Sequence, residues 1–144
     1  MSKKSVKIAA LIESCQGREL DAHYLGYFEC FNRGLFYEAH DVLEELWLAD
    51  RHGPSGAFYQ GLIQFAGAFV HLQKHTPHRP RLRPAAALLK LARANLRNYP
   101  GTHEHLDLAQ LLRLIEHWLG RLEKNQFLVN PLSSVSAPIL RLLP

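Results

Sequence analysis

One short segment, FYEAHDVLEELW at residues 36–47, holds four carboxylates and a histidine. His40 and Glu44 are four residues apart, so on a helix their side chains lie together on one face. An imidazole beside a carboxylate can transfer a proton, hold a polar ligand or contribute to a metal site. The chemistry therefore depends on whether this segment is helical and on which element faces the edge that carries His40 and Glu44.

The apolar spacing of this segment predicts a helix over about residues 35–50. At about 100° per residue, one broad apolar arc collects Leu35, Phe36, Ala39, Val42, Leu43, Leu46 and Trp47. His40 and Glu44 lie just beyond one border of this arc, while Glu38 lies on the other border. We therefore do not expect this helix alone to supply three metal ligands, and another element must complete any site.

The next segment, from about Pro54 to His75, predicts a helix that is apolar on nearly every side. Its single polar stripe consists of Gln60, Gln64, Gly67, His71 and His75. The short link at Gly53 and Pro54 makes the two helices antiparallel neighbours. We therefore expect His40 and Glu44 to meet Gln60, Gln64 or His71 in a polar pocket.

This placement suggests roles for the candidate site residues. It does not indicate a reaction, a cofactor or whether the protein is an enzyme. His40, oriented by Glu44, is the candidate for proton handling or ligand binding. The other expected ligand-binding residues are Glu38, Trp47, Gln60, Gln64 and His71, with Trp47 as an apolar wall and Glu38 paired to a basic residue. Three interpretations remain: a structural hydrogen-bond network, a pocket for a small polar ligand, or a divalent metal site of His40, Glu44 and His71.

Helical spacing recurs along the rest of the chain and predicts an all-α, single-domain bundle of five or six helices. The remaining predicted helices run from Lys3 to about Cys15, from a cap at Asp21 to Gly34, from Pro84 to about Asn98, and from a cap at Thr102 to about Lys124. The proline-rich residues 76–84 form a loop. The bundle domain spans residues 1–124, and residues 125–144 form an extended or partly disordered tail.

Charge is distributed unevenly along the chain. Residues 1–50 hold five Lys and Arg against nine Asp and Glu, residues 51–103 hold eight against none, and residues 104–144 hold four of each. The acidic first third and the basic middle are expected to face each other. The alternative function follows from the same pattern: a scaffold or interaction protein with a purely structural polar cluster and a basic surface for nucleic acid or an acidic protein.

The composition favours a cytoplasmic protein. Two cysteines, Cys15 and Cys30, do not make a disulfide scaffold or a zinc site, and the apolar run at residues 8–12 is too short for a secretory signal. Residues 53–73 lack charged side chains and approach the roughly 20 residues of a membrane span, but their glutamines and glycines favour a buried central helix. No membrane association is expected, and pairing with a second copy is compatible with a helical bundle.

Two stretches, FNRGLFYEAHDVLEELW and GLIQFAGAFVH, resemble the family called domain of unknown function 309, which comprises small all-helical prokaryotic proteins. The matching positions are Phe31, Asn32, Gly34, Glu38, Ala39, His40, Glu44, Trp47, Gly61, Leu62, Ile63, Gln64 and His71. Asp41 stands where the family usually has Glu. The resemblance covers roughly residues 25–122 and implies a multihelical fold without an established reaction, substrate or cofactor. Its motif includes His40, Glu44, Gln64 and His71, which favours a shared polar pocket.

Overall fold

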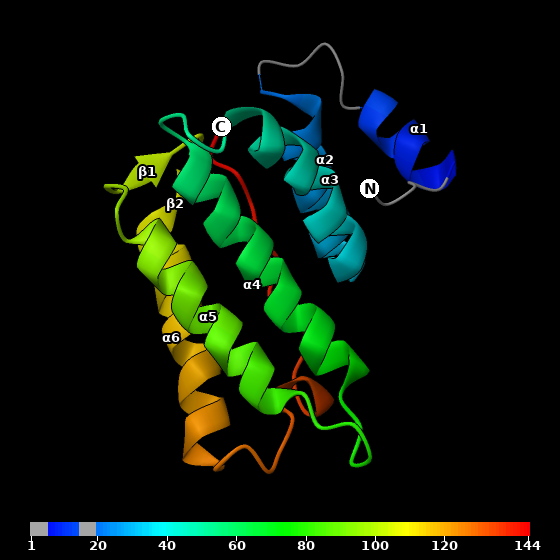
Figure 1. Ribbon diagram of the computed structural model, residues 1–144, viewed down its shortest axis with the longest axis vertical. Coiled ribbons are helices and arrows are strands. Elements are labelled where there is room, and N and C mark those ends of the chain that lie inside the picture. Colours follow the sequence, from blue (N-terminus) through cyan, green and yellow to red (C-terminus); the bar gives the residue numbers. More distant parts are fainter. Residues whose placement is uncertain (1–5, 15–19) are drawn as a thin grey trace.

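The computed structural model describes residues 6–14 and 20–144 of the chain, which form six α-helices and one small hairpin (Figure 1). The helices are α1 (Val6–Ser14), α2 (Ala22–Asn32), α3 (Phe36–Asp50), α4 (Gly56–Lys74), α5 (Leu82–Leu96) and α6 (Leu108–Lys124); the hairpin pairs β1 (Thr102–His103) with β2 (Leu106–Asp107). The predicted all-α bundle is confirmed. Cys15 and the start of the first predicted helix lie outside the described residues.

Helix α4 lies at the centre, between the α2–α3 pair and the α5–α6 pair (Figure 1). Its phenylalanine side chains are fully buried and extend the core to both sides. The ring of Phe65 stacks on Phe31 of α2 with a centroid distance of 5.4 Å, and Phe69 meets Trp118 of α6 at 4.9 Å. Because α4 is surrounded in this way, Gln64 and His71 are partly buried, whereas Gln73 and Lys74 at its end are exposed.

The α2–α3 hairpin follows from local signals in the sequence. The carboxylate of Asp21 accepts a hydrogen bond from the backbone N–H of His23 at 2.7 Å and caps α2, as predicted. Gly34 has a φ of 77°, and the N–H of Leu35 donates to the carbonyl of Cys30 at 2.9 Å, which ends the helix. Helix α3 begins immediately afterwards, so its start is fixed against α2.

The predicted start of the sixth helix at Thr102 is wrong. Thr102 pairs with Asp107 in the hairpin, and α6 begins at Leu108 with the Asp107 carboxylate accepting from the backbone N–H of Gln110 at 3.1 Å. In the hairpin, Leu106 is buried in the core. Helix α5 begins at Leu82, so Pro84 lies in its first turn as predicted, where a proline needs no partner for a backbone N–H.

After α6 the chain makes a short 3₁₀ turn, η1 (Pro131–Ser133), and returns as an extended segment, which confirms the extended tail. The side-chain amide of Asn32 holds this segment through two 2.8 Å hydrogen bonds to the backbone N–H and C=O of Leu140. Leu140 is only 4% exposed. The Asn of the family-like motif therefore fixes the tail against the end of α2.

The ion pairs of α5 link it to α6. Arg93 Nη1 lies 2.7 Å from Glu116 Oε1, and Lys90 Nζ lies 3.5 Å from Glu123 Oε2. Within the described ranges, the basic middle of the chain forms its ion pairs with α6, while the acidic helix α3 packs directly on α4. None of the described helices combines the length and the apolar character that crossing a membrane requires.

Candidate functional site

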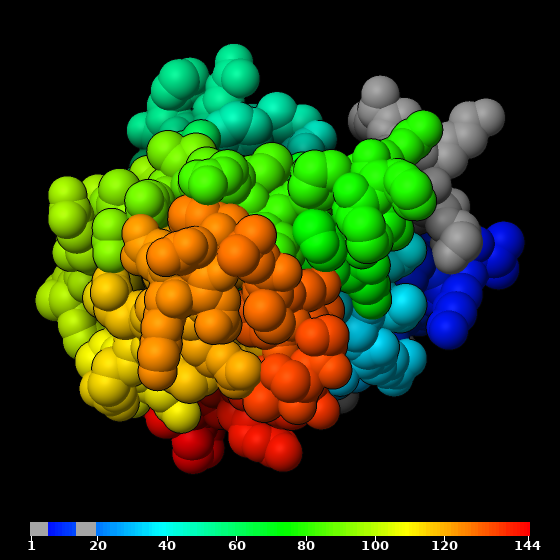
Figure 2. Space-filling view, turned by 90° about the horizontal axis from the view of Figure 1, so that it is seen from below, coloured from blue at the N-terminus to red at the C-terminus, as the bar shows by residue number. Residues whose placement is uncertain are grey.

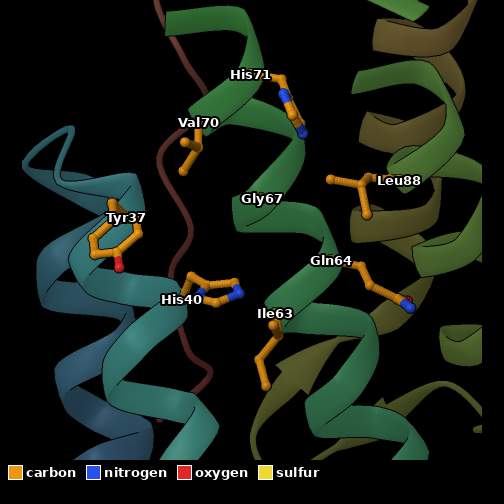
Figure 3. A pocket seen from close by; sticks show the side chains of 8 residues that line it. All are labelled: Tyr37, His40, Ile63, Gln64, Gly67, Val70, His71 and Leu88. Carbon is orange, nitrogen blue, oxygen red and sulfur yellow. The ribbon is translucent and has the colours of Figure 1, made fainter. Parts of the chain in front are cut away.

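An open cavity of about 240 Å³ lies across the middle of α4 (Figure 3). It is lined by Tyr37 and His40 of α3, by Ile63, Gln64, Gly67, Val70 and His71 of α4, and by Leu88 of α5. Figure 3 shows α3 on one side and Leu88 on the other, with α4 between them. The wall is mostly apolar, and its side chains with ring nitrogens or amides are His40, Gln64 and His71.

Gly67 lies at the centre of this cavity, and its missing side chain contributes to the hollow. A Cβ atom built on Gly67 would lie 3.1 Å from Leu88 Cδ1, closer than ordinary van der Waals contact. Helix α5 therefore approaches α4 closely at this turn. Any larger side chain at position 67 must push Leu88 aside or extend into the cavity.

His40 points from α3 toward α4 (Figure 3), as its place on the edge of the apolar arc predicts. Its Nε2 lies 3.9 Å from Glu44 Oε2, an ion-pair distance that is too long for a hydrogen bond. Its Nδ1 is buried and has no hydrogen-bond partner within the part of the chain that the structure describes. The ring of Tyr37 stacks beside the imidazole at a centroid distance of 6.1 Å. His40 thus lines the cavity and carries a buried ring nitrogen that has no hydrogen-bond partner among the described residues.

His71 lies one turn beyond Gly67, at the other end of the cavity. Burial, and then the positive charges of Arg81 and Lys74, lower the pKa of His71 below its ordinary value. Arg81 Nη1 lies 3.4 Å from His71 Nδ1. The neutral imidazole is therefore favoured, and it can accept or donate a hydrogen bond through different tautomers.

Gln64 lines the cavity, but its amide points toward α5 (Figure 3). Its Oε1 accepts a 2.8 Å hydrogen bond from Asn95 Nδ2. Part of the predicted polar stripe therefore joins α4 to α5 instead of facing His40. This hydrogen bond fits the first interpretation drawn from the sequence, a structural hydrogen-bond network.

The structure brings three of the predicted site residues to one cavity: His40, Gln64 and His71. Glu44 does not line the cavity, but it lies beside the lining residue His40. Glu38, Trp47 and Gln60 lie outside the lining, and Glu38 makes no ion pair among the described residues. The lining residues that the sequence prediction did not assign to the site are Tyr37, Ile63, Gly67, Val70 and Leu88. Helical spacing offered a signal for Tyr37, which is three residues before His40, whereas nothing local indicated Leu88.

In the structure, His40, Glu44 and His71 are not grouped as ligands of one metal ion. Within residues 6–14 and 20–144, no group of three or more His, Cys, Asp or Glu side chains is arranged to hold a metal ion. The physical reason is the position of the two histidines, since one lies on the α3 side of the cavity and the other at the far turn of α4 (Figure 3).

A second polar cluster lies at the amino end of α4 and has its groups paired. Tyr59 Oη donates to Glu104 Oε2 at 3.3 Å, and Ser55 Oγ and His103 Nε2 are hydrogen-bonded at 3.0 Å. Tyr24 Oη donates to the backbone carbonyl of Glu104 at 2.8 Å. Burial, followed by the Glu104 carboxylate, raises the pKa of Tyr59 to about 12. This cluster ties the β1–β2 hairpin to α2 and α4.

The cavity is suited to non-covalent binding. Its eight lining residues include no Ser, Thr, Cys, Lys, Asp or Glu, so its hydrogen-bonding and proton-transferring side chains are His40, His71, Gln64 and Tyr37. They do provide two imidazoles above an apolar floor. A ligand with an apolar body and hydrogen-bonding groups at its ends matches such a wall.

Fold and cavity together define a small all-helical protein with an open cavity across its central helix. Residues 24–80 match the family described as Domain of unknown function (DUF309), which confirms the resemblance in the part that contains α3 and α4. A protein of Aquifex aeolicus (strain VF5), described as "Uncharacterized protein", is 29% identical over 93 residues. These residues are 65% of this chain and 26% of that protein, so the chain spans about a quarter of its relative. No solved structure matches the chain.

The family-like motif divides into two groups in the structure. Asn32 holds the tail, Gly34 ends α2, and Gly61 packs so close to Leu96 that a Cβ atom there would lie 2.7 Å from Leu96 Cγ. These three residues therefore have structural roles. His40 and His71 are different, because the first has an unused nitrogen and both face the cavity.

Proposed function

We propose that the protein binds a small ligand in the cavity over Gly67, with His40 as the main hydrogen-bonding residue. The observation that supports the proposal is the buried Nδ1 of His40, which has no partner in the described structure and lies in a residue that lines an open cavity. A buried polar atom without a partner costs about 1–3 kcal/mol, and a bound ligand that supplies the partner recovers that free energy.

The size and wall of the cavity limit the ligand. A volume of about 240 Å³ is below the roughly 300–1,000 Å³ of sites for drug-sized molecules, so the ligand is small. Ile63, Val70 and Leu88 require an apolar portion, while His40 and His71 interact with polar groups. The proposal keeps the cytoplasmic setting expected from the sequence, and the Aquifex aeolicus relative supports a prokaryotic source.

The test is a melting-temperature screen with small carboxylates, amides and alcohols at millimolar concentration. A ligand that binds the folded state raises the melting temperature. Gly67→Leu places a side chain in the cavity and should abolish the rise. Gly120→Leu is the matched control, since it also replaces a helical glycine but a Cβ atom there would have no atom within 4 Å among its surroundings.

His40→Ala should also remove the ligand-dependent rise. Gly120→Leu should retain or increase the baseline melting temperature, because leucine favours helix over glycine by about 1 kcal/mol, whereas Gly67→Leu must also displace Leu88 and can lower it. The proposal is wrong if no compound raises the melting temperature of the unaltered protein, or if the rise survives Gly67→Leu.

A further inference from the structure

Arg81, the residue before α5, brings a guanidinium group to the His71 end of the cavity. Its Nη1 lies 3.4 Å from His71 Nδ1, and its backbone N–H donates to His75 Nδ1 at 2.9 Å. The Arg81 Nε is buried and has no hydrogen-bond partner among the described residues. One orphaned nitrogen thus belongs to His40, which lines the cavity on the α3 side, and the other belongs to Arg81, which contacts the lining residue His71 from outside the lining.

The charge of Arg81 is not balanced by the segment that forms this end of the cavity. Residues 51–103, which include α4, the following loop and α5, contain no Asp or Glu. In the described parts of the chain Arg81 forms no ion pair. On the opposite side, Lys74 Nζ lies 5.6 Å from the ring centroid of Tyr37, another lining residue. Two cations thus lie next to residues of the cavity wall, and the carboxylate of Glu44 lies beside His40.

We propose that the ligand is a small organic anion whose carboxylate or phosphate group binds Arg81 beside His71. Its apolar part then lies over Gly67, against Ile63 and Leu88, and its far end reaches His40. This inference rests on the proposed function, since it names the chemical class of the ligand for the same cavity. A guanidinium is well matched to such groups because its N–H donors bind two oxygens of one oxyanion in parallel.

The position of Arg81 favours a small molecule over a nucleic-acid strand. Phosphate contacts to nucleic acid usually come from exposed basic side chains, such as those of Arg79 in the loop and Arg83 in the first turn of α5. Arg83 stacks over the ring of Phe127 at 4.3 Å, where this part of the chain lies beside the residues that follow α6 (Figure 2). Arg81 instead has a buried Nε and contacts a residue that lines the cavity.

The experiment compares hexanoate, hexyl phosphate and the neutral hexanamide by titration calorimetry with the full chain. Hexanoate or hexyl phosphate should bind at least about tenfold more tightly than hexanamide, because a charge-assisted hydrogen bond is lost with the amide. Which of the two anions binds better distinguishes carboxylate from phosphate ligands. Inorganic phosphate without the hexyl chain should bind more weakly than hexyl phosphate.

Variants of the loop sharpen this comparison. Arg81→Gln should weaken anion binding at least about tenfold and leave hexanamide binding unchanged. Arg81→Lys should restore only part of the affinity, since it keeps the charge and loses the paired donors. Arg79→Gln is the matched control, because it removes an exposed arginine of the same loop. Circular dichroism melting verifies that each variant folds.

The His71 imidazole provides an independent readout of where the anion binds. Its pKa is lowered by burial, Arg81 and Lys74, so a bound anion should raise the pKa by offsetting both cations. NMR titration of the His71 ring with and without hexanoate measures the change. A ligand bound elsewhere would leave this pKa unchanged and would contradict the inference.

The possible failures are distinguishable. If hexanamide binds as well as hexanoate and Arg81→Gln has no effect, the ligand is not an anion, while loss of binding in Gly67→Leu would still support the cavity. If anion binding requires Arg81 but survives Gly67→Leu, the cavity proposal is wrong and the anion binds outside it. Tight binding of an oligonucleotide that depends on Arg79 as much as on Arg81 would overturn the small-molecule assignment.

Discussion

Two regions along α4 differ in how their polar groups are paired. Near its amino end, Tyr59, Ser55 and Tyr99 form hydrogen bonds with the hairpin and with the backbone. Farther along the helix, His40 and Arg81 each have a buried nitrogen without a partner among the described residues. Both regions contain a histidine and a tyrosine near the same helix. The difference is therefore one of arrangement and not of residue type. Polar residues that complete one another's hydrogen bonds hold helices together, and polar residues that do not are available to a ligand.

The backbone at the paired end also differs from that around the cavity. The hairpin turn contains Glu104 with a φ of 49° and His105 with a φ of 62°, a conformation that costs non-glycine residues free energy. The hydrogen bonds from Tyr24 and Tyr59 to Glu104 offset this cost. This strained turn is thus explained by the packing of the fold, and backbone strain alone does not mark the binding region.

The largest expected effect comes from breaking the paired end at Tyr99. Its hydroxyl donates to the carbonyl of Pro54 at 2.7 Å and accepts from the backbone N–H of Phe58 at 3.1 Å. Tyr99→Phe leaves both groups without this partner, and we expect the free energy of unfolding to fall by about 1–3 kcal/mol. Urea denaturation measures the loss.

Ligand binding provides the control for this variant. The cavity lies farther along α4 and does not include Tyr99, so the affinity for hexanoate should stay within about twofold of the unaltered protein. A large loss of affinity with little loss of stability would reverse the roles that we assign to the two ends of α4.

A smaller effect, opposite in sign, is expected at the cavity from His40→Phe. The phenylalanine ring can keep the stacking on Tyr37 and removes the buried Nδ1, which has no partner in the described part of the chain. We expect the free energy of unfolding to stay the same or rise by up to about 1 kcal/mol, while ligand binding is lost. Urea denaturation and titration calorimetry on the same sample measure both quantities.

The opposite result at His40 would change the interpretation of the cavity. A loss of more than about 1 kcal/mol in His40→Phe would mean that the imidazole already stabilises the ligand-free fold. In that case His40 belongs with the structural residues of the amino end, and the sequence-based alternative of a purely structural cluster gains support.

The sequence predicted the elements of the fold better than the composition of the cavity. Helical spacing and the short link after Asp50 correctly placed His40 and His71 on the facing sides of α3 and α4. Leu88 and Arg81 depend on how α5 packs against α4, which is a long-range contact that no local pattern specifies. For the same reason Gln64 was expected to face His40 but instead bonds to Asn95 of α5.

The start of α6 shows a second limit of the sequence. Thr102 and Asp107 are both good helix caps, and local preference does not decide between them. The decision comes from burial of Leu106 and from the hydrogen bond between Tyr24 and Glu104, which joins residues 80 positions apart. Local signals therefore predicted a helix start correctly where the sequence held one candidate cap. They failed where it held two, because tertiary contacts determine which of them begins the helix.

The smallest expected effect is a pH dependence of stability at the cavity end. The pKa of His71 is below its ordinary value of 6.5 in the folded protein because of burial, Arg81 and Lys74. Below about pH 6.5 the unfolded chain therefore binds a proton at this residue more readily than the folded protein does. The His71 contribution must lower stability progressively as the pH falls from this value, and it must vanish above about pH 7.5.

His71→Gln isolates this contribution from those of the other histidines. The difference in unfolding free energy between the variant and the unaltered protein should be constant at alkaline pH and should shift in favour of the variant as the pH falls below about 6.5. Saturating hexanoate should reduce that shift, since an anion beside Arg81 favours the protonated imidazole. A pH-independent difference would mean that His71 titrates alike in the folded and unfolded states, and that Arg81 does not act on it.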